Sequence, residues 1–269
     1  FIEITNKEGL DTAVYKSIRF PLSKFQSKWR QLKERRKFKR MISELSEVTE
    51  NSIYINYNQN PNSDLAKLCD EYGTDKGELS PDSNPYPWAS HNYSDFYELI
   101  FSSRRNSTES LLECGIGTAD TDIPSNMGEE GNPGASWRTW RDYFPNAEIT
   151  GIDIDNNVMF SEKRIDTYCV DQTSKDSIEG FLDKKDGNFD IIIDDGLHEF
   201  NANVSLFKNT IHRLKSDGIY IIEDVSYQNL REYEEYFIKY LDDYHAKIID
   251  LENPDRNRSS DRLIMITHI

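Results

Sequence analysis

Two short runs of β-branched residues, each followed by a pair of acids, constrain this chain more than any other feature. Residues 189–195 read FDIIIDD and residues 218–224 read GIYIIED. A run of this kind is typical of a buried parallel strand, which delivers polar side chains to a cleft at its carboxyl end. The two runs therefore predict neighbouring strands whose polar ends meet. The residues brought together are Asp194, Asp195, Glu223 and Asp224, with His198 close behind.

These acids predict a metal site. Carboxylates crowded in one cleft raise one another's pKa unless a positive charge lies among them. A hard divalent cation such as Mg²⁺ prefers oxygen ligands and is the natural occupant. Adjacent residues of a regular strand face opposite ways, so Glu223 and Asp224 can share an ion only if the backbone turns there, as we expect. Asp194 should point away from Asp195, which predicts a cofactor-binding or structural role for Asp194.

The composition limits the class of protein and its location. The chain has 269 residues, of which 32 are Lys or Arg and 48 are Asp or Glu, and its net charge of -16 argues against nucleic acid as the main partner. The length suits one α/β domain with an appendage. Three cysteines without a CxxC pattern, and no apolar run long enough for a bilayer, favour a cytoplasmic protein. The chain begins with Phe1 rather than Met, so it is a candidate fragment of a longer protein.

Residues 1–60 differ from the rest of the chain, and we interpret them as a basic helical extension that precedes the main domain at residues 61–269. Residues 16–40 hold eleven Lys or Arg and a single acid. Their apolar residues recur at helical spacing, which gives an amphipathic helix. Three interpretations stay open: the helix docks on its own acidic domain, lies on an anionic membrane, or binds a partner protein. Residues 52–62 are a candidate linker, and a homo-oligomer is also open.

A short loop bracketed by Gly73 and Gly77 contains Thr74 and Lys76. Its two glycines allow the backbone to approach a ligand closely, which makes Thr74 and Lys76 candidate cofactor contacts. An ordinary capped turn explains the same residues about as well.

A glycine turn follows the first predicted core strand. Gly115 and Gly117 come directly after Glu113, a pattern that suits the first turn of a nucleotide-binding α/β sheet. It departs from the dinucleotide fingerprint because Asp120 stands where a third glycine is expected. Residues 120–135 form an inserted segment, which we expect to be a lid or a substrate wall.

Two further strands end in polar residues. Asp153 is the first acid to emerge from the strand at residues 148–153, where an acid holds both ribose hydroxyls in nucleotide-binding sheets. The strand at residues 166–170 delivers Asp171 and Gln172, a pair that can hold an adenine edge. A helix cap explains Asp171 about as well.

Helical spacing predicts which side chains of two helices enter the core, and loop length predicts the last strand pair. We expect Leu99 to pack inward, and Ser136 to cap a helix whose Trp137 lies in the core. The strands at residues 245–251 and 262–268 should be antiparallel, because their connection is too short for a crossover helix.

Together these motifs resemble those of the class I S-adenosylmethionine-dependent methyltransferases. More narrowly, the chain is similar to the metal-dependent sugar O-methyltransferases typified by the macrolide-sugar enzymes, a group that borders on the cephalosporin hydroxylase-like proteins. The matching pieces lie between about residues 64 and 225. They are YGTDKG at 72–77, HNY at 91–93, ECGIGT at 113–118, GASWR at 134–138, GIDID at 151–155, DIIIDDGLH at 190–198 and IED at 222–224. One departure is Leu197, where relatives usually carry a small polar residue.

The resemblance implies an α/β fold with a Rossmann-like, seven-stranded, mostly parallel sheet and a reversed last strand. It also implies S-adenosylmethionine and Mg²⁺ as cofactors. The cofactor contacts would be Thr74, Lys76, Glu113, Gly115, Gly117, Asp153, Asp171, Gln172 and Asp194. The metal ligands would be Asp195, Glu223 and Asp224, and His198 would be the catalytic base beside Asp195.

The resemblance further implies metal-assisted methyl transfer to a sugar hydroxyl, which would belong to a nucleotide-linked sugar, a glycan or a glycosylated metabolite. Such a reaction would fit polysaccharide biosynthesis. Such a hydroxyl is nearly as reluctant to ionise as water, whose pKa is about 15.7. A bound Mg²⁺ would stabilise the developing charge while His198, with an ordinary pKa of about 6.5, accepts the proton. A small phenol or catechol fits the same site. An NAD-dependent oxidoreductase and a non-catalytic scaffold also stay open as hypotheses.

Overall fold

The computed structural model describes residues 52–56, 60–80, 84–86, 88, 90–239, 241, 243–252 and 262–269. All of these residues fall within one compact unit. The predicted basic helix in residues 16–40 lies outside the described residues. Within them, no helix combines the length and the apolar character needed to cross a membrane.

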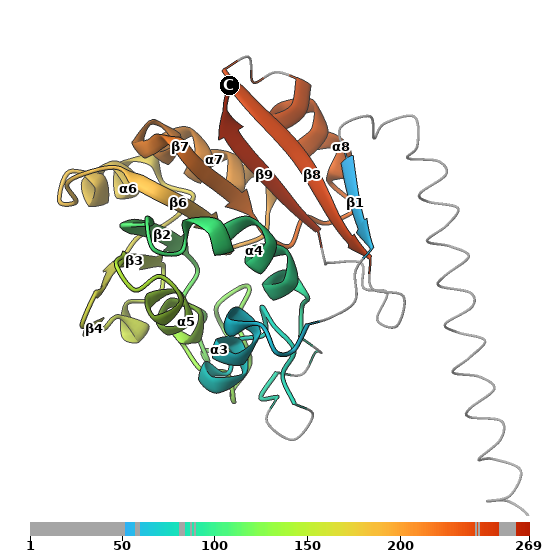
Figure 1. Ribbon diagram of the computed structural model, residues 1–269. Coiled ribbons are helices and arrows are strands. Elements are labelled where there is room, and N and C mark those ends of the chain that lie inside the picture. The colour runs from blue at the N-terminus through green and yellow to red at the C-terminus, as the bar shows by residue number, and fades with distance from the viewer. Residues whose placement is uncertain are drawn as a thin grey trace, which may run out of the picture. The chain divides into compact units, whose positions relative to one another are not determined.

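The described strands form one sheet in the order β1-β8-β9-β7-β6-β2-β3-β5-β4 (Figure 1). Their bounds are Ser52–Asn56 for β1, Ser110–Cys114 for β2, Glu148–Asp153 for β3, Ser161–Glu162 for β4, Ile165–Cys169 for β5, Phe189–Asp194 for β6, Leu214–Ile222 for β7, Tyr244–Glu252 for β8 and Arg262–His268 for β9. Strand β9 is antiparallel to both of its neighbours, β7 and β8. The predicted mostly parallel core with a reversed last strand is therefore confirmed.

Two edge strands extend the seven predicted ones. Strand β1 pairs in parallel with β8, so the interpretation of Ser52–Asn56 as linker was wrong. Its sequence, SIYIN, has three strand-forming residues, and the unpaired edge of β8 offers them a ladder of hydrogen bonds. At the opposite edge, β4 adds a short antiparallel pairing to β5.

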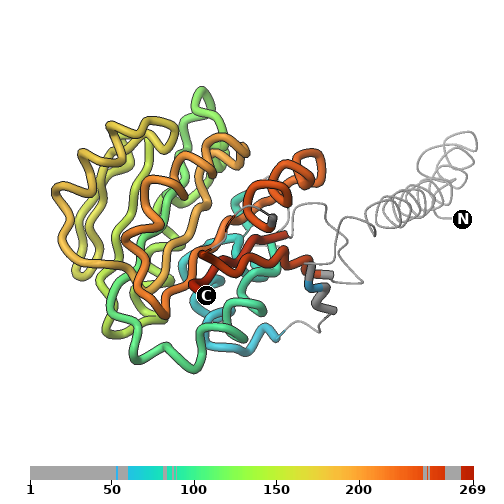
Figure 2. Tube along the Cα trace, turned by 90° about the horizontal axis from the view of Figure 1, so that it is seen from above, coloured from blue at the N-terminus to red at the C-terminus, as the bar shows by residue number. Residues whose placement is uncertain are grey.

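Helices cover both faces of the sheet (Figures 1 and 2). The helices on one face are α3, Asp64–Tyr72; α4, Tyr93–Phe101; and α5, Ala135–Tyr143. Those on the other are α6, Lys175–Leu182; α7, Phe200–Thr210; and α8, Leu230–Tyr233, which continues into a π-helical turn at Glu234–Lys239. Helix α3 ends at Gly73, whose φ of 74° closes the last turn, and so directs the chain into the loop that holds Lys76.

An aromatic cluster packs α4 and α5 against the sheet. Tyr97 stacks on Phe101 at 5.3 Å between ring centroids and meets Trp140 edge-on at 5.4 Å. Trp137 is fully buried, as predicted. Leu99, however, is 67% exposed, so its predicted inward packing was wrong. The larger aromatic side chains of α4 occupy the core side of the helix, which turns Leu99 toward solvent.

The contact of α5 with β3 predicts that Gly151 tolerates no side chain. A Cβ at Gly151 would lie 2.1 Å from Trp137 Cη2 in the buried indole. We expect Gly151→Ala to lower the free energy of unfolding in urea by about 1–3 kcal/mol, because the core cannot accommodate the methyl group without moving. The control is Gly180→Ala in α6, where nothing lies within 4 Å of the added Cβ, and where alanine should stabilise the helix. Equal effects at both positions would contradict the prediction.

Candidate active site

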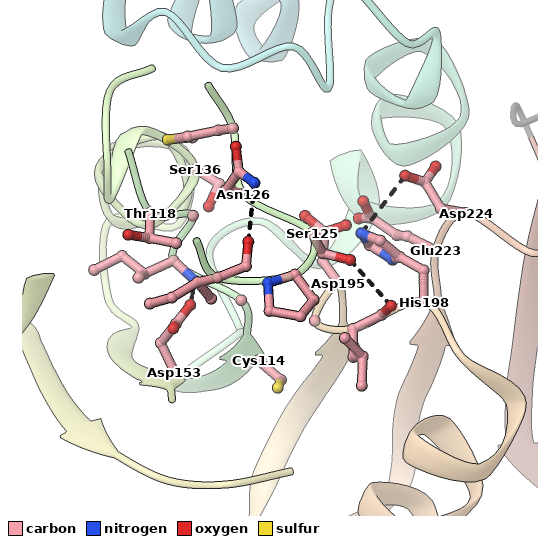
Figure 3. A pocket seen from close by; sticks show the side chains of 18 of the residues that line it. Cys114, Thr118, Ser125, Asn126, Ser136, Asp153, Asp195, His198, Glu223 and Asp224 are labelled. Atoms are coloured by element: carbon pink, nitrogen blue, oxygen red, sulfur yellow. Dashed lines mark hydrogen bonds and ion pairs between the residues drawn. The ribbon is translucent and has the colours of Figure 1, made fainter. Parts of the chain in front are cut away.

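A cavity of about 770 Å³ lies at the carboxyl ends of β2, β3, β6 and β7 (Figure 3). The predicted site residues that line it are Thr74, Lys76, Gly115, Gly117, Asp153, Asp171, Gln172, Asp195, His198, Glu223 and Asp224. Glu113 and Asp194 do not line it, and both carboxylates are fully buried. The labelled side chains divide the cavity into an end at Asp153 and an end at the acids and His198 (Figure 3).

Asp153 lies at the tip of β3 and faces the cavity. Its Oδ2 accepts a hydrogen bond from the backbone N–H of Ile116 at 2.8 Å, and its Oδ1 accepts one from Asp155 N–H at 2.9 Å. Burial raises the pKa of this carboxyl, although the two N–H groups oppose the shift. Asp155 instead accepts a hydrogen bond from the Thr118 hydroxyl at 2.6 Å and does not line the cavity. Of these two acids only Asp153 lines the cavity, and its role as the ribose ligand stays a prediction.

The glycine turn allows the segments after β2 and β6 to touch. Gly115 has a φ of 95°, and a Cβ there would lie 2.0 Å from the carbonyl oxygen of Asp195. A residue with a side chain would push Asp195 away from the cavity. Gly115 therefore both forms the turn and leaves room for the backbone of Asp195 beside it.

Residues 122–127 of the inserted segment line the cavity, where we predicted a lid or a substrate wall. The N–H of Met127 donates to the carbonyl oxygen of Thr118 at 2.9 Å. The Ser125 hydroxyl donates to the carbonyl oxygen of Leu197 at 3.0 Å, which ties this wall to the loop of His198.

Gln172 and Asp194 brace the loop that follows β6. The Gln172 amide donates to Asp194 Oδ1 at 2.7 Å and accepts a hydrogen bond from Leu197 N–H at 2.9 Å. Asn203 donates to the other Asp194 oxygen at 2.9 Å, and burial raises the pKa of Asp194 to about 6. The nitrogen and the oxygen of the Gln172 amide thus both form hydrogen bonds to other groups of the protein, whereas we expected the amide to contact adenine. Asp171 accepts hydrogen bonds from Thr173, and Ser174 rather than Asp171 caps α6.

Lys76 extends into the acid cluster. Its Nζ lies 2.5 Å from Asp195 Oδ2, 2.5 Å from Glu223 Oε2 and 3.2 Å from Glu113 Oε1. Burial disfavours the charged ammonium, but these carboxylates outweigh burial and raise the pKa of Lys76 well above its usual value. We predicted that Lys76 contacts the cofactor. The structure places Lys76 on the cavity wall, where its ammonium pairs with three acids.

Glu113 lies behind Lys76 rather than on the cavity wall, where a contact with the cofactor was expected. Its Oε2 accepts hydrogen bonds from the Ser136 hydroxyl at 2.9 Å and from the Trp140 indole at 3.1 Å. Burial raises the pKa of Glu113 to about 7. The predicted N-cap role of Ser136 in α5 is therefore wrong. The cap is Gly134, with a φ of 79°, and the Ser136 hydroxyl is free to serve Glu113.

The predicted backbone turn after β7 is present and sends two adjacent acids to different surroundings. Strand β7 ends at Ile222, and Asp224 has a φ of 55°. Glu223 points to Lys76 and accepts a hydrogen bond from the Tyr97 hydroxyl at 2.5 Å. Asp224 accepts one from the Tyr93 hydroxyl. Burial raises the pKa of Glu223, whereas His91, His198 and Tyr93 outweigh burial and lower the pKa of Asp224.

His198 faces Asp224 across the cavity. Its Nε2 lies 3.9 Å from Asp224 Oδ2, and its Nδ1 is buried without a hydrogen-bond partner among the described residues. His91 lies on the other side of Asp224, with Nδ1 3.7 Å from Oδ1. Two imidazoles thus flank one carboxylate.

Two sets of residues in the described part of the chain are close enough to hold a metal ion, and they share Asp195. The outer set is Asp195, His198 and Asp224, and the inner set is Glu113, Asp195 and Glu223. Within each set the ligand atoms lie within 4.8 Å of one another. The predicted ligands Asp195, Glu223 and Asp224 therefore do not form one set, since Asp224 belongs to the outer set, Glu223 to the inner set and Asp195 to both. The Lys76 ammonium lies in the inner set.

Comparison with known proteins finds relatives that are similar to part of the chain. The 8-demethyl-8-alpha-L-rhamnosyl tetracenomycin-C 2'-O-methyltransferase of Streptomyces olivaceus is 30% identical over 161 residues, which cover 60% of this chain and 37% of that protein. The mycinamicin VI 2''-O-methyltransferase of Micromonospora griseorubida is 32% identical over 164 residues, covering 60% and 36%. The chain thus spans less than two fifths of the length of these curated relatives. A scan against models of protein families finds no match.

The fold has solved counterparts. The MycE methyltransferase of the mycinamycin pathway, in complex with Mg and SAH, matches with a TM-score of 0.53 at 23% identity, covering 77% of this chain and 55% of that one. The chain thus shares its fold with this methyltransferase, and over three fifths of its length it is similar in sequence to sugar O-methyltransferases.

Sequence reasoning missed the tyrosine hydroxyls that donate hydrogen bonds to the acids. Tyr93 and Tyr97 lie one turn apart on α4, and their hydroxyls reach Asp224 and Glu223. The four-residue spacing of the two tyrosines was a visible signal, because it places both hydroxyls on the same helix face. Their target was not visible, since it lies more than 120 residues further along the chain.

The raised pKa of Asp194 predicts a pH dependence of stability. The folded protein holds this proton more tightly than the unfolded chain, so the stabilisation is complete below about pH 4 and is lost as the pH rises through about 6. Relative to Asp194→Asn, we expect the wild type to lose on the order of 3 kcal/mol of unfolding free energy between about pH 4 and about pH 7. Urea unfolding in EDTA at several pH values measures this. A difference that does not change with pH would contradict it.

Proposed function

We propose that this protein is a methyltransferase that uses S-adenosylmethionine and a divalent metal to methylate a sugar hydroxyl. The observation that carries the proposal is one cavity with two chemically different ends. One end has the glycine turn and Asp153, and the other has the outer metal set with His198. The volume of about 770 Å³ lies within the range of about 300–1,000 Å³ that small-molecule and cofactor sites occupy.

The donor end suits a nucleoside. The Asp153 carboxylate lies beside the glycine turn, and a carboxylate can accept hydrogen bonds from both ribose hydroxyls. Asp171 and Thr74 also line the cavity and are proposed as neighbouring contacts.

The acid end fits a hard cation. Asp195 and Asp224 are 24% and 22% exposed, so their carboxylates can reach an ion in the cavity. Glu223 is proposed as the third ligand, because a carboxylate has about four acceptor positions and the contacts described above use two of them. Oxygen-rich ligand sets of this kind suit Mg²⁺.

The reaction needs a deprotonated acceptor held in line with the methyl group. Bound Mg²⁺ would stabilise charge on the acceptor oxygen, and S-adenosylmethionine would supply an already activated methyl group. His198 would accept the hydroxyl proton at Nε2, where the Asp224 carboxylate at 3.9 Å stabilises the resulting imidazolium. The left-handed backbone of His198, with a φ of 57°, is the kind of strain that active sites retain to orient a side chain.

Two aromatic residues support a sugar as the acceptor. Tyr86 and Trp88 line the cavity and stack at 5.5 Å between ring centroids. The Trp88 indole donates to Asp75 at 2.6 Å and the Tyr86 hydroxyl donates to the Gly73 carbonyl at 2.7 Å, so both rings are held in place. Trp88 is 39% exposed and offers an apolar surface, which suits the C–H face of a sugar ring. A phenol would use the same surface and is the second candidate acceptor.

The remaining predictions about context stay predictions. They are a cytoplasmic location, a place in polysaccharide biosynthesis, a homo-oligomer, and a division into an extension at residues 1–60 and a catalytic domain at residues 61–269. The strand β1 at Ser52–Asn56, however, belongs to the sheet of the domain. The sequence relatives favour the methyl donor over a dinucleotide, and they favour an enzyme over a scaffold.

A direct assay tests the proposal. Labelled S-adenosylmethionine is incubated with the protein, Mg²⁺ and a panel of nucleotide-linked sugars, methyl rhamnoside and catechol, and the products are read by mass spectrometry. We expect transfer to at least one sugar, loss of transfer in excess EDTA, and recovery when Mg²⁺ is restored. Transfer to catechol alone would contradict the sugar acceptor, and full activity in EDTA would contradict the metal. Calorimetric binding of NAD⁺ but not S-adenosylhomocysteine would favour an oxidoreductase.

A variant of His198 separates the base from the binding residues. His198→Ala should lower kcat by about 10²–10⁴-fold, the usual contribution of a positioned base. The affinity for S-adenosylhomocysteine, measured by calorimetry, should be unchanged, because Asp153 lies at the other end of the cavity. His212→Ala is the control, since His212 is exposed in the short turn Ile211–Arg213 after α7. Normal turnover in His198→Ala would remove the residue from the mechanism.

A further inference from the structure

We propose that Lys76 is a positioning residue that acts as a permanent cation of the acid cluster. Its ammonium fills the place between Glu113, Asp195 and Glu223, and so limits the cluster to a single divalent ion on the cavity side. This inference rests on the proposed metal-assisted function and extends it to a residue that contacts the proposed metal ligands Asp195 and Glu223.

The contacts of Lys76 match what a bound cation would make. A lysine ammonium has three protons, and three carboxylates surround this one at 2.5, 2.5 and 3.2 Å. Glu113 Oε1 is buried and has no hydrogen-bond partner among the described residues, so the ammonium is its compensation. The Lys76 side chain is 3% exposed, and those of Glu113 and Glu223 are 0% and 1% exposed.

The backbone of Lys76 is held as firmly as its ammonium. Its carbonyl oxygen accepts a hydrogen bond from Ser94 N–H at 2.8 Å. The next residue, Gly77, packs so tightly that a Cβ there would lie 2.7 Å from Cys69 Cβ. The cation therefore enters the cluster from a fixed point between α3 and α4.

Charge explains why the inner set needs a cation. Buried carboxylates are costly to ionise without a partner, and removing one member of a buried ion pair leaves the others uncompensated. The inner set already has its ligand atoms within 4.8 Å of one another. Without Lys76, a divalent cation bound by Glu113, Asp195 and Glu223 would restore the charge balance of the inner set.

A purely structural lysine and a metal-limiting lysine predict different results. Loss of a structural ion pair lowers stability whether or not metal is present. Loss of a metal-limiting cation lowers stability in EDTA, and metal then restores it. The number of bound ions separates the two roles, because it does not depend on catalysis.

The experiment counts Mn²⁺ on the full chain. We expect the wild type to bind one Mn²⁺ per chain, measured by electron paramagnetic resonance and calorimetry, and Lys76→Met to bind two. The Lys76→Met, Glu113→Gln double variant should return to one, because Glu113 belongs to the inner set alone. The thermal midpoint of Lys76→Met should fall in EDTA and rise again in excess Mn²⁺ toward that of the wild type. Lys76→Gln, prepared in Mn²⁺, provides the same count if the methionine variant does not fold.

Lys215→Met is the matched control. Lys215 also pairs with two acids, Asp190 at 3.0 Å and Glu109 at 3.6 Å, but it lies away from the cavity. Its loss should leave the Mn²⁺ count unchanged, and added Mn²⁺ should not restore the midpoint. One Mn²⁺ in Lys76→Met, with a midpoint that metal does not restore, would overturn the inference. A wild type that binds no Mn²⁺ beside a variant that binds one would instead overturn the metal in the proposed function and leave the inference standing.

Discussion

The ion pairs of Lys76 join the segments on which the site depends. They connect the loop after α3 to Glu113 at the end of β2, to Asp195 after β6 and to Glu223 after β7. Parallel strands end at the same edge of a sheet, so the acids at their tips must meet. Like charges at that edge repel one another, and the ammonium makes their proximity tolerable. The tyrosine hydroxyls of α4 then donate one hydrogen bond each to Glu223 and Asp224.

Backbone strain collects around the same cavity. Among the described residues other than glycine, four have a positive φ, namely Ser125, Arg164, His198 and Asp224. Three of these, all except Arg164, line the cavity. Such conformations persist only where the surroundings hold them, and here the hydrogen bonds of Ser125 to Leu197 and of Tyr93 to Asp224 supply that support. The strain thus coincides with the residues proposed for catalysis and metal binding.

Most of the sheet was predictable because its signals are local. The apolar runs of β6 and β7, the glycine turn after β2 and the short connection of the last two strands each act within a few residues. The errors came from distant partners. Strand β1 pairs with β8, which lies far along the chain. The Ser136 hydroxyl donates its hydrogen bond to Glu113 and does not cap α5. Leu99 is exposed because neighbouring aromatic residues take the core side of α4.

The sequence by itself determined which acids lie at the strand tips. A β-branched run that ends in acids is typical of a buried parallel strand, which places those acids at its carboxyl end. The sequence also determined that Gly115 and Asp153 follow neighbouring strands. Only the tertiary structure decided the partner of each acid. Glu223 and Asp224 are adjacent in sequence, yet one meets Lys76 and the other meets His91 and His198. The physical reason is that the charge and pKa of a buried group depend on whatever packs against it, and these groups come from loops and helices that no local pattern specifies.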